Sequence, residues 1–231
     1  MNAPQAPRAR VVFLLDVDNT LLDNDAVIAD VRAALAREVG AERELRYWSI
    51  FEQCRAEAGY ADYLGALQRF RLEDPHDPNV LKVSSMLLNY PFRERLFRGS
   101  LEVVRRLGDW GTTVILTDGD VVFQPLKVER SGLAAAVEGR VLIYVHKEKE
   151  LGDVERRFPA DHYVLVDDKV RILSAVKAVW GARVTTVFPK QGHYATDPGV
   201  AAYPAPDVTV GHIAELLDLT PPPGAGTLRK A

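Results

Sequence analysis

Short apolar runs recur along the chain, and each is continuous rather than alternating with polar residues. Continuous runs rich in Val and Ile are typical of strands that are buried on both faces of a parallel sheet. Five such runs predict five strands: Val11–Leu15, Thr113–Leu116, Val141–Val145, Tyr163–Val166 and Val184–Val187. A weaker run over Val208–Val210, followed by Ile213–Leu219, predicts an edge strand and a closing helix.

Helical patterns separate the later strands. They cover Phe123–Ser131, Lys149–Phe158 and Val170–Val179, with short connections on either side. Alternation of strand and helix with short loops is the signature of a doubly wound α/β sheet. The predicted fold class is therefore α/β, with a Rossmann-like parallel sheet.

The interval between the first two strands breaks this alternation, because it holds only helical patterns. Gly40, Gly59 and a Pro-rich turn after Glu73 divide it, and such residues end helices. Four helices are predicted there: Ala26–Val39, Leu45–Ala58, Tyr60–Phe70 and Val80–Leu88. A basic amphipathic helix over Phe92–Leu107 is predicted to lead back to the sheet.

These segments predict how the chain is divided. We expect a discontinuous α/β core formed by residues 8–20 and 98–220, and a smaller all-helical unit inserted at residues 21–97. Three prolines follow Thr220 and can continue neither a helix nor the interior of a sheet. Residues 1–7 and 221–231 are therefore expected to be flexible termini.

Composition limits the possible partners. The 231 residues carry 29 Lys and Arg against 32 Asp and Glu, a formal net charge of −3, which gives no general electrostatic reason to bind nucleic acid or an anionic membrane. Cys54 is the single cysteine, so no intrachain disulfide can form. Asp16 interrupts the N-terminal apolar run too early for a signal peptide, and no segment approaches the ~20 apolar residues of a membrane span. We expect a cytoplasmic protein, and the sequence leaves its oligomeric state open.

Polar side chains follow four of the predicted strands, at the point where each strand ends. They are Asp16 and Asp18 after the first strand, Thr117, Asp118 and Gly119 after the second, Lys147 after the third, and Asp167 and Asp168 after the fourth. In open α/β sheets the ligand crevice lies outside the carboxyl ends of the strands. We therefore expect these groups to meet at one edge of the sheet.

Taken singly, each of these signals also fits a structural role. The acids after the first strand can form an Asx turn, Thr117 can cap a helix, and Lys147 can be a solvated surface lysine. Two adjacent buried acids, in contrast, are costly unless a cation is near. Paired carboxylates favour a divalent cation, and a Gly-containing turn before a helix offers N–H groups to an anion. Together the four signals predict a catalytic site.

With these motifs, the sequence resembles the haloacid dehalogenase-like superfamily of hydrolases from Val11 to about Leu219. The matches are Asp16, Asp18 and Thr20 to the Asp-x-Asp-x-Thr motif, Thr117 to the second motif, Lys147 to the lysine motif, and Asp167 with Asp168 to the acidic pair. For the lysine motif, Lys149 is an alternative and Lys127 a weaker one. The inserted residues 21–97 resemble the cap domain that members of this superfamily often carry.

The resemblance implies a mechanism. Asp16 would attack a phosphoryl group and form an aspartyl-phosphate, while Asp18 would act as general acid and then as general base. Lys147 would neutralise charge on Asp16, and Thr117 with the amides of Asp118 and Gly119 would hold the phosphoryl oxygens. Mg²⁺ would be the cofactor, and its candidate ligands are Asp16, Asp18 through its carbonyl, Asp167 and Asp168.

Several reactions share this fold, and the residues favour one of them. Dehalogenases of the superfamily attack carbon with the same first Asp and need neither an acid at the Asp18 position nor a metal-binding acidic pair. The sequence therefore favours a phosphohydrolase acting on a small phosphorylated metabolite, with a dehalogenase or a phosphomutase as alternatives. A non-catalytic phosphate-binding module is disfavoured because all the catalytic groups are present. A phosphoacceptor receiver domain is disfavoured because its motifs occur in the reverse order.

Overall fold

The centre of the molecule is a six-stranded parallel sheet. The computed structural model describes residues 9–220 and the backbone of 229–230. The strands are β1 (Ala9–Leu15), β2 (Thr112–Asp118), β3 (Val141–Tyr144), β4 (Ala160–Val166), β5 (Val184–Pro189) and β6 (Val208–Val210), in the order β3-β2-β1-β4-β5-β6. Each predicted strand is present, and the predicted α/β fold class with a Rossmann-like sheet is confirmed.

The central strand, β1, is apolar towards both faces of the sheet. Phe13 and Leu14 are fully buried and belong to different apolar clusters, because successive side chains of a strand point to opposite faces. Leu14 pairs with Val114 of β2 on one side and with Leu165 of β4 on the other. Complete burial of a large apolar side chain contributes about 1.5–3 kcal/mol, so β1 anchors both layers of helices.

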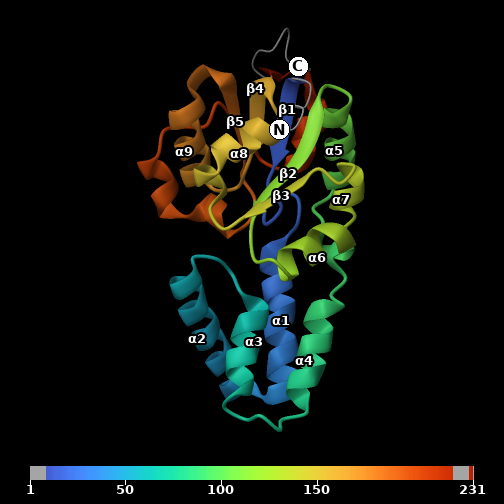
Figure 1. The fold of residues 1–231 in the computed structure, drawn as a ribbon, viewed down its shortest axis with the longest axis vertical. Helices are drawn as coiled ribbons and strands as arrows, with labels where there is room; N and C mark the ends of the chain where they lie inside the picture. The colour runs from blue at the N-terminus through green and yellow to red at the C-terminus, as the bar shows by residue number, and fades with distance from the viewer. Residues whose placement is uncertain (1–8, 221–228, 231) are drawn as a thin grey trace, which may run out of the picture.

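Helices cover both faces of the sheet (Figure 1). On one side lie α5 (Ser100–Gly108) and α7 (Leu133–Ala136), and on the other α8 (Leu151–Arg157) and α9 (Val170–Trp180). A further helix, α6 (Phe123–Arg130), follows the carboxyl end of β2. The predicted closing helix over Ile213–Leu219 is instead a 3₁₀-helix, η6 (Ile213–Asp218).

The remaining short elements complete the connections. Four further 3₁₀-helices are η2 (Lys147–Lys149), η3 (Gly181–Arg183), η4 (His193–Thr196) and η5 (Pro198–Ala202). A small antiparallel pair joins β7 (Leu219–Thr220) to β8 (Arg229–Lys230). Apart from β8, the termini predicted to be flexible lie outside the described residues. Within residues 9–220, none of the helices combines the length and the apolar character that crossing a bilayer requires.

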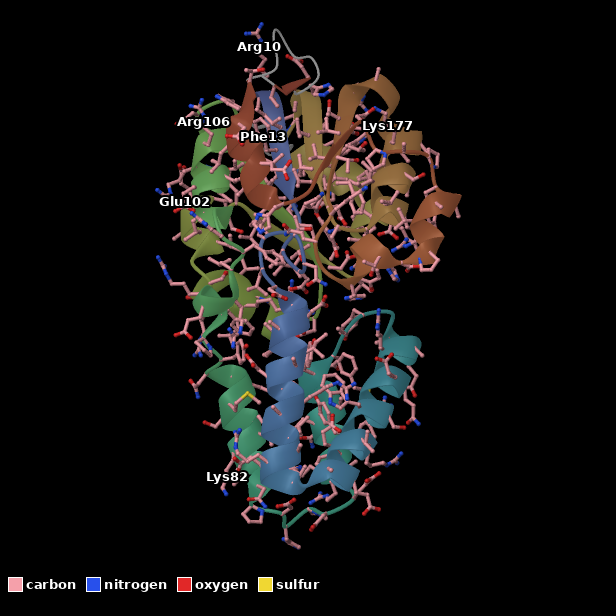
Figure 2. All side chains as sticks on the ribbon, turned by 180° about the vertical axis from the view of Figure 1, so that it is seen from behind. Arg10, Phe13, Lys82, Glu102, Arg106 and Lys177 are labelled. Carbon is pink, nitrogen blue, oxygen red and sulfur yellow. The ribbon has the colours of Figure 1, made fainter. Side chains whose placement is uncertain are left out.

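The interval after β1 folds into four helices that lie beyond the carboxyl end of the sheet (Figure 1). We call α1 (Asn24–Val39), α2 (Ala41–Ala58), α3 (Tyr63–Arg71) and α4 (Asn79–Leu88) the helical bundle. Val27, Val31 and Leu35 recur every four residues along α1 and are fully buried, so they form its inner face. Lys82 marks the end of the bundle that lies far from the sheet, whereas Phe13 lies within the sheet (Figure 2).

The chain crosses between the sheet and the helical bundle twice, and the two crossing segments pair with each other. Leu22 and Leu96 form an antiparallel bridge, and the Phe97 N–H donates to the Leu21 carbonyl at 3.0 Å. The predicted continuous helix over Phe92–Leu107 is therefore wrong. It is divided into η1 (Phe92–Arg95) and α5, because Leu96 is extended to reach Leu22 and Gly99 has a left-handed φ of 86°.

Candidate active site

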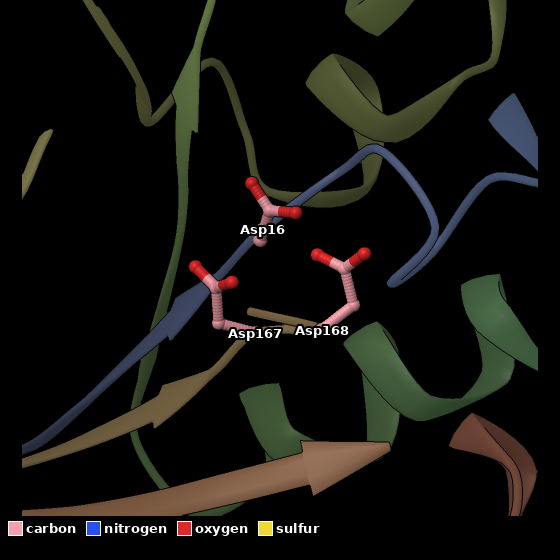
Figure 3. Close-up of side chains that lie close together, drawn as sticks. All are labelled: Asp16, Asp167 and Asp168. Carbon is pink, nitrogen blue, oxygen red and sulfur yellow. The ribbon is translucent and has the colours of Figure 1, made fainter. Parts of the chain in front are cut away.

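Three carboxylates converge at the carboxyl edge of the sheet. Asp16 follows β1, whereas Asp167 and Asp168 follow β4, and one oxygen of each lies within 4.8 Å of the others. Figure 3 shows the three side chains directed into the same space at the ends of the two strands. The proximity follows from the sheet itself, since β1 and β4 are neighbours that end in register, with Leu15 paired to Val166. All three side chains are buried.

Lys147 supplies the positive charge of this cluster. Its Nζ contacts Asp16 Oδ1 and lies 2.7 Å from Asp167 Oδ2, and its side chain is only 1% exposed. Burial alone would lower the pKa of this lysine, but the charges of Asp16 and Asp167 outweigh burial and raise it, so the ammonium form is favoured. Lys149, the alternative for the lysine motif, is exposed two residues further on.

Asp168 is the carboxylate that lacks a partner. Within the described part of the chain, neither of its oxygens accepts a hydrogen bond. Its backbone N–H donates to Thr20 Oγ1 at 3.0 Å, and that hydroxyl donates to Asp16 Oδ2 at 3.2 Å, so Thr20 ties the two acids together. Burial, followed by the charges of Asp16 and Asp167, raises the pKa of Asp168 well above its usual value.

The donor set fits a divalent cation. Burial also raises the pKa of Asp167 to about 6, although Lys147 opposes the shift. Buried carboxylate oxygens without donors are costly, and hard oxygen ligands are those that Mg²⁺ prefers. Asp168 is the side chain best placed to hold such an ion, because neither of its oxygens has a hydrogen-bond partner among the described residues. The oxygens of Asp16 and Asp167 already contact donors, so each would share an oxygen between a donor and the ion.

We expect Mg²⁺ to stabilise the protein through Asp168. At a concentration 100 times its Kd, a ligand that binds only the folded state adds about 2.7 kcal/mol, which for a chain of this size raises the Tm by roughly 5–10 °C. Thermal denaturation with Mg²⁺ and with EDTA measures the shift. Asp168→Asn is expected to remove most of it, whereas Asp109→Asn, at the exposed end of α5, should leave it unchanged. An equal shift in both variants would place the ion elsewhere.

Asp18 lies apart from the three converging carboxylates. Its Oδ1 lies 2.6 Å from Lys127 Nζ, which also donates to Asn24 Oδ1 at 3.0 Å. Lys127, the weakest candidate for the lysine motif, thus pairs with Asp18 and not with Asp16. Because the Asp18 carboxylate is engaged in this way, its side chain is not placed as a metal ligand, and its backbone carbonyl stays the predicted ligand atom.

The loop after β2 contributes a hydroxyl group. Thr117 Oγ1 accepts a hydrogen bond from Gln124 Nε2 at 2.9 Å, and its own proton has only a 3.5 Å contact with the Asp118 carbonyl. The hydroxyl is therefore oriented with its proton available to an incoming acceptor. Asp118 Oδ1 accepts from the Lys147 backbone N–H at 2.8 Å, so this acid fixes the segment that carries the lysine, and burial raises its pKa.

The Gly119 amide, which the resemblance predicts to hold phosphoryl oxygens, already has a partner within the protein. Its N–H donates to the Tyr144 carbonyl at 2.9 Å and thus belongs to the hydrogen bonding between β2 and β3. Glycine is needed at this position for another reason, since a Cβ there would lie 2.5 Å from Gln124 Cβ. The close approach of Gln124 to the loop is what brings its amide to Thr117.

Sequence reasoning missed Gln124, Asn24 and Lys169. Gln124 and Lys127 lie three residues apart on α6 and therefore share one face, which is directed at Thr117 and Asp18. That spacing, directly after the Gly119 turn, was the available signal. Lys169 follows the acidic pair, and its pKa is raised because Asp16 and Asp168 outweigh the effect of burial.

A cavity of about 660 Å³ lies between the helical bundle and this edge of the sheet. Asp18, Asp118 and Lys127 line it from the sheet side, and Trp48 and Phe51 of α2 line it from the bundle side. The cavity therefore joins charged groups to an apolar wall, as is usual for small-molecule sites.

Comparison with known structures identifies the class of protein. A haloacid dehalogenase-like hydrolase from Burkholderia xenovorans LB400 is 59% identical, with a TM-score of 0.86 over 91% of this chain and 96% of that one. No protein-family model and no curated protein matches the sequence. At this identity and coverage, both the sequence and the fold of this chain match a haloacid dehalogenase-like hydrolase, so the protein is a hydrolase. The chain belongs to the haloacid dehalogenase-like family.

More distant structures share the fold. The HAD-hydrolase YfnB from Bacillus subtilis, bound to magnesium, is 16% identical with a TM-score of 0.59, over 91% of this chain and 97% of that one. An L-2-haloacid dehalogenase from Xanthobacter autotrophicus is 15% identical with a TM-score of 0.58, over 90% and 96%. Because enzymes of both descriptions share this fold, the reaction has to be argued from the site.

Proposed function

We propose that the protein is a Mg²⁺-dependent phosphohydrolase that acts on a small phosphorylated metabolite. The observation that carries the proposal is that Asp16 and Asp18 are held in different environments. Asp16 lies beside Lys147 and Asp168, whereas Asp18 lines the cavity and pairs with Lys127. Attack on carbon needs only the first of these acids, while phosphoryl transfer also uses the second as a proton carrier and benefits from a metal site.

In the first step, Asp16 attacks the phosphorus atom of the substrate. Lys147 and Thr20 hold its two oxygens, so the carboxylate is oriented before the substrate arrives. A bond forms between an Asp16 oxygen and phosphorus while the ester bond breaks, and the departing oxygen takes a proton from Asp18. Thr117 donates its hydroxyl proton to a phosphoryl oxygen.

In the second step, water hydrolyses the aspartyl-phosphate. Asp18, now a carboxylate, takes a proton from the water that attacks phosphorus, and the bond to Asp16 breaks to release inorganic phosphate. Asp16 and Asp168, with the Asp18 carbonyl, would hold Mg²⁺, which reduces the repulsion between the phosphate and the carboxylates. Lys147 opposes the same negative charge from the side of Asp167.

In this proposal the helical bundle is a cap. Residues 21–97 form the cap, and residues 8–20 and 98–220 form the catalytic core, in a protein that acts in the cytoplasm and binds neither nucleic acid nor membrane. The cavity between the two parts supports this division, because side chains of both line it. A substrate bound there would be screened from bulk water during phosphoryl transfer.

The test is a substrate panel with two readouts. Phosphate monoesters and 2-haloacids are each incubated with the protein in Mg²⁺ or in EDTA, and released phosphate and halide are measured. We expect phosphate release that requires Mg²⁺ and falls about 10²–10⁴-fold in Asp18→Asn. Release of halide in EDTA would overturn the proposal in favour of a dehalogenase. Transfer of phosphate to a second hydroxyl in place of water would favour a phosphomutase.

A further inference from the structure

Five cationic side chains line the cavity between the helical bundle and the sheet, and two of them form no hydrogen bond with a carboxylate. The five are Arg32, Arg55, Lys127, Lys169 and Arg171. Three are paired within hydrogen-bond distance, Arg32 with Glu44 at 2.8 Å, Lys127 with Asp18 at 2.6 Å, and Arg171 with Glu148 at 2.9 Å. Arg55 and Lys169 remain, and they come from opposite sides of the cavity, one from the bundle and one from the sheet.

Lys169 is a half-buried ammonium group without an acceptor. Among the described residues, its Nζ forms no hydrogen bond or ion pair, although the charges of Asp16 and Asp168 act on it from a greater distance, and the centre of the Tyr194 ring lies 5.1 Å away. An ammonium group carries three donors, and leaving them unpaired away from bulk water is costly. A ligand in the cavity would supply the missing acceptor.

Arg55 reaches the same tyrosine from the helical bundle. It lies in the last turn of α2, and its Nη2 donates to the Tyr194 hydroxyl at 3.3 Å. Its nearest carboxylate, Glu52, is 3.8 Å away, and the two side chains are 49% and 62% exposed, so this ion pair contributes little. The Arg55 guanidinium thus keeps donors for a further anion.

Tyr194 is held in place between these two cations. The neighbouring His193 N–H donates to Asp25 Oδ2 at 2.8 Å, its ring contacts Asp25 Oδ1 at 2.6 Å, and the rings of His193 and Tyr194 lie 4.0 Å apart. Because the Tyr194 hydroxyl oxygen accepts a hydrogen bond from Arg55, the hydroxyl can donate its own proton to a ligand. Arg55 and Lys169 therefore approach Tyr194 from the two sides of the cavity, and all three side chains line it.

Three of the other acids that line the cavity have hydrogen-bond partners of their own. Asp18 is paired with Lys127, Asp118 accepts from the Lys147 N–H, and Asp197 accepts from the Gly199 N–H. The fourth acid, Glu52, is exposed and lies 3.8 Å from Arg55. None of these acids therefore accepts a hydrogen bond from Arg55 or Lys169, whose donors stay available to a ligand.

We propose that Arg55, Lys169 and Tyr194 bind a second anionic group of the substrate. The substrate is then a phosphate monoester that also carries a carboxylate or a second phosphate. This inference rests on the proposed function, which assigns the first anionic group to phosphoryl transfer at Asp16. A guanidinium group can bind either second anion through two parallel hydrogen bonds, and the ammonium and phenol add further donors.

Binding of three probes to the Asp16→Asn protein tests the proposal without turnover. Propyl phosphate, 2-carboxyethyl phosphate and propane-1,3-diyl bisphosphate share one carbon chain length and differ in the second group. Calorimetric titration in Mg²⁺ is expected to show that one or both doubly anionic probes bind roughly 10- to 100-fold more tightly than propyl phosphate. The better of the two identifies the second group as carboxylate or phosphate.

Substitutions of Arg55 and Lys169 test whether these two residues cause the tighter binding of the doubly anionic probes. Adding Arg55→Ala or Lys169→Met should reduce the advantage of the doubly anionic probes to within about threefold. Arg46→Ala is the matched control, because Arg46 lies on the same helix with the same 49% side-chain exposure but pairs with Glu73 and does not line the cavity. It should retain the full advantage. Equal binding of all three probes, or an advantage that survives Arg55→Ala, would overturn the inference.

This design tests the phosphohydrolase function and the second anion site independently, so one proposal can be contradicted while the other holds. Turnover of propyl phosphate by the unaltered protein in Mg²⁺ tests the phosphohydrolase function, and the ratio of probe affinities tests the second anion site. A protein that hydrolyses propyl phosphate but binds the three probes equally would retain the first proposal and lose the second.

Discussion

Asp16→Asn is expected to reduce kcat/KM for phosphate monoesters by on the order of 10⁴-fold or more. The amide has nearly the shape of the carboxylate and keeps an oxygen for Thr20 or Lys147, but it is not a nucleophile. The substitution therefore removes the covalent step and leaves the surrounding site in place. No other change at the site isolates this step so directly.

The experiment compares phosphate release by the unaltered protein, Asp16→Asn and Asp109→Asn in Mg²⁺. Asp109 is an exposed acid at the end of α5, so its variant controls for the loss of one carboxylate. Circular dichroism and thermal denaturation establish that each variant is folded. Phosphate release by Asp16→Asn at more than about one hundredth of the normal rate would exclude Asp16 as the nucleophile.

Lys147→Met is expected to have the largest effect on stability. The ammonium group is buried between Asp16 and Asp167, so its removal leaves two buried carboxylates without their cation. Breaking a buried ion pair by removing one partner costs about 3–5 kcal/mol, which is a large part of the stability of a typical domain. Turnover should be lost as well, because the positive charge beside the nucleophile disappears.

Urea denaturation in EDTA at neutral pH measures this loss, and Lys149→Met is its matched control. Lys149 lies two residues away in the same 3₁₀-helix but is exposed, so its variant should change the free energy of unfolding by no more than about 0.5 kcal/mol. If Lys149→Met were the destabilised and inactive variant, the assignment of the lysine motif would be reversed.

Most of the fold could be predicted because its strands are short, continuous apolar runs. Burial on both faces leaves the same pattern in β1, β4 and β5, and it needs no knowledge of partners. The division of Phe92–Leu107 could not be predicted, because it depends on a contact between Leu22 and Leu96, which are far apart in the sequence. The amphipathic pattern continues through Gly99, although the helical backbone conformation is interrupted there.

The acids of the candidate site could be predicted for a related reason. Asp16, Asp167 and Asp168 directly follow strands, so the parallel arrangement of the sheet alone brings them to one edge. The spacing of Gln124 and Lys127 on α6 is visible in the sequence, but the groups that this face meets depend on how α6 docks, and the contacts of Lys169 depend in the same way on the loop before α9. Likewise, the Gly119 amide is engaged because of its pairing with β3, and single-strand patterns do not show which N–H groups are used.

The pairing of the two crossing segments also bears on how such a chain can change over time. Residues 21–23 and 95–97 lie side by side, joined by a 2.8 Å hydrogen bond from the Asp23 N–H to the Arg95 carbonyl and by a 3.0 Å bond from the Phe97 N–H to the Leu21 carbonyl. A tight turn could therefore replace everything between them without moving β1 or α5. Entry to and exit from the bundle are thus fixed at one place, so a change in its cavity-lining residues need not shift the strand ends that carry the acids.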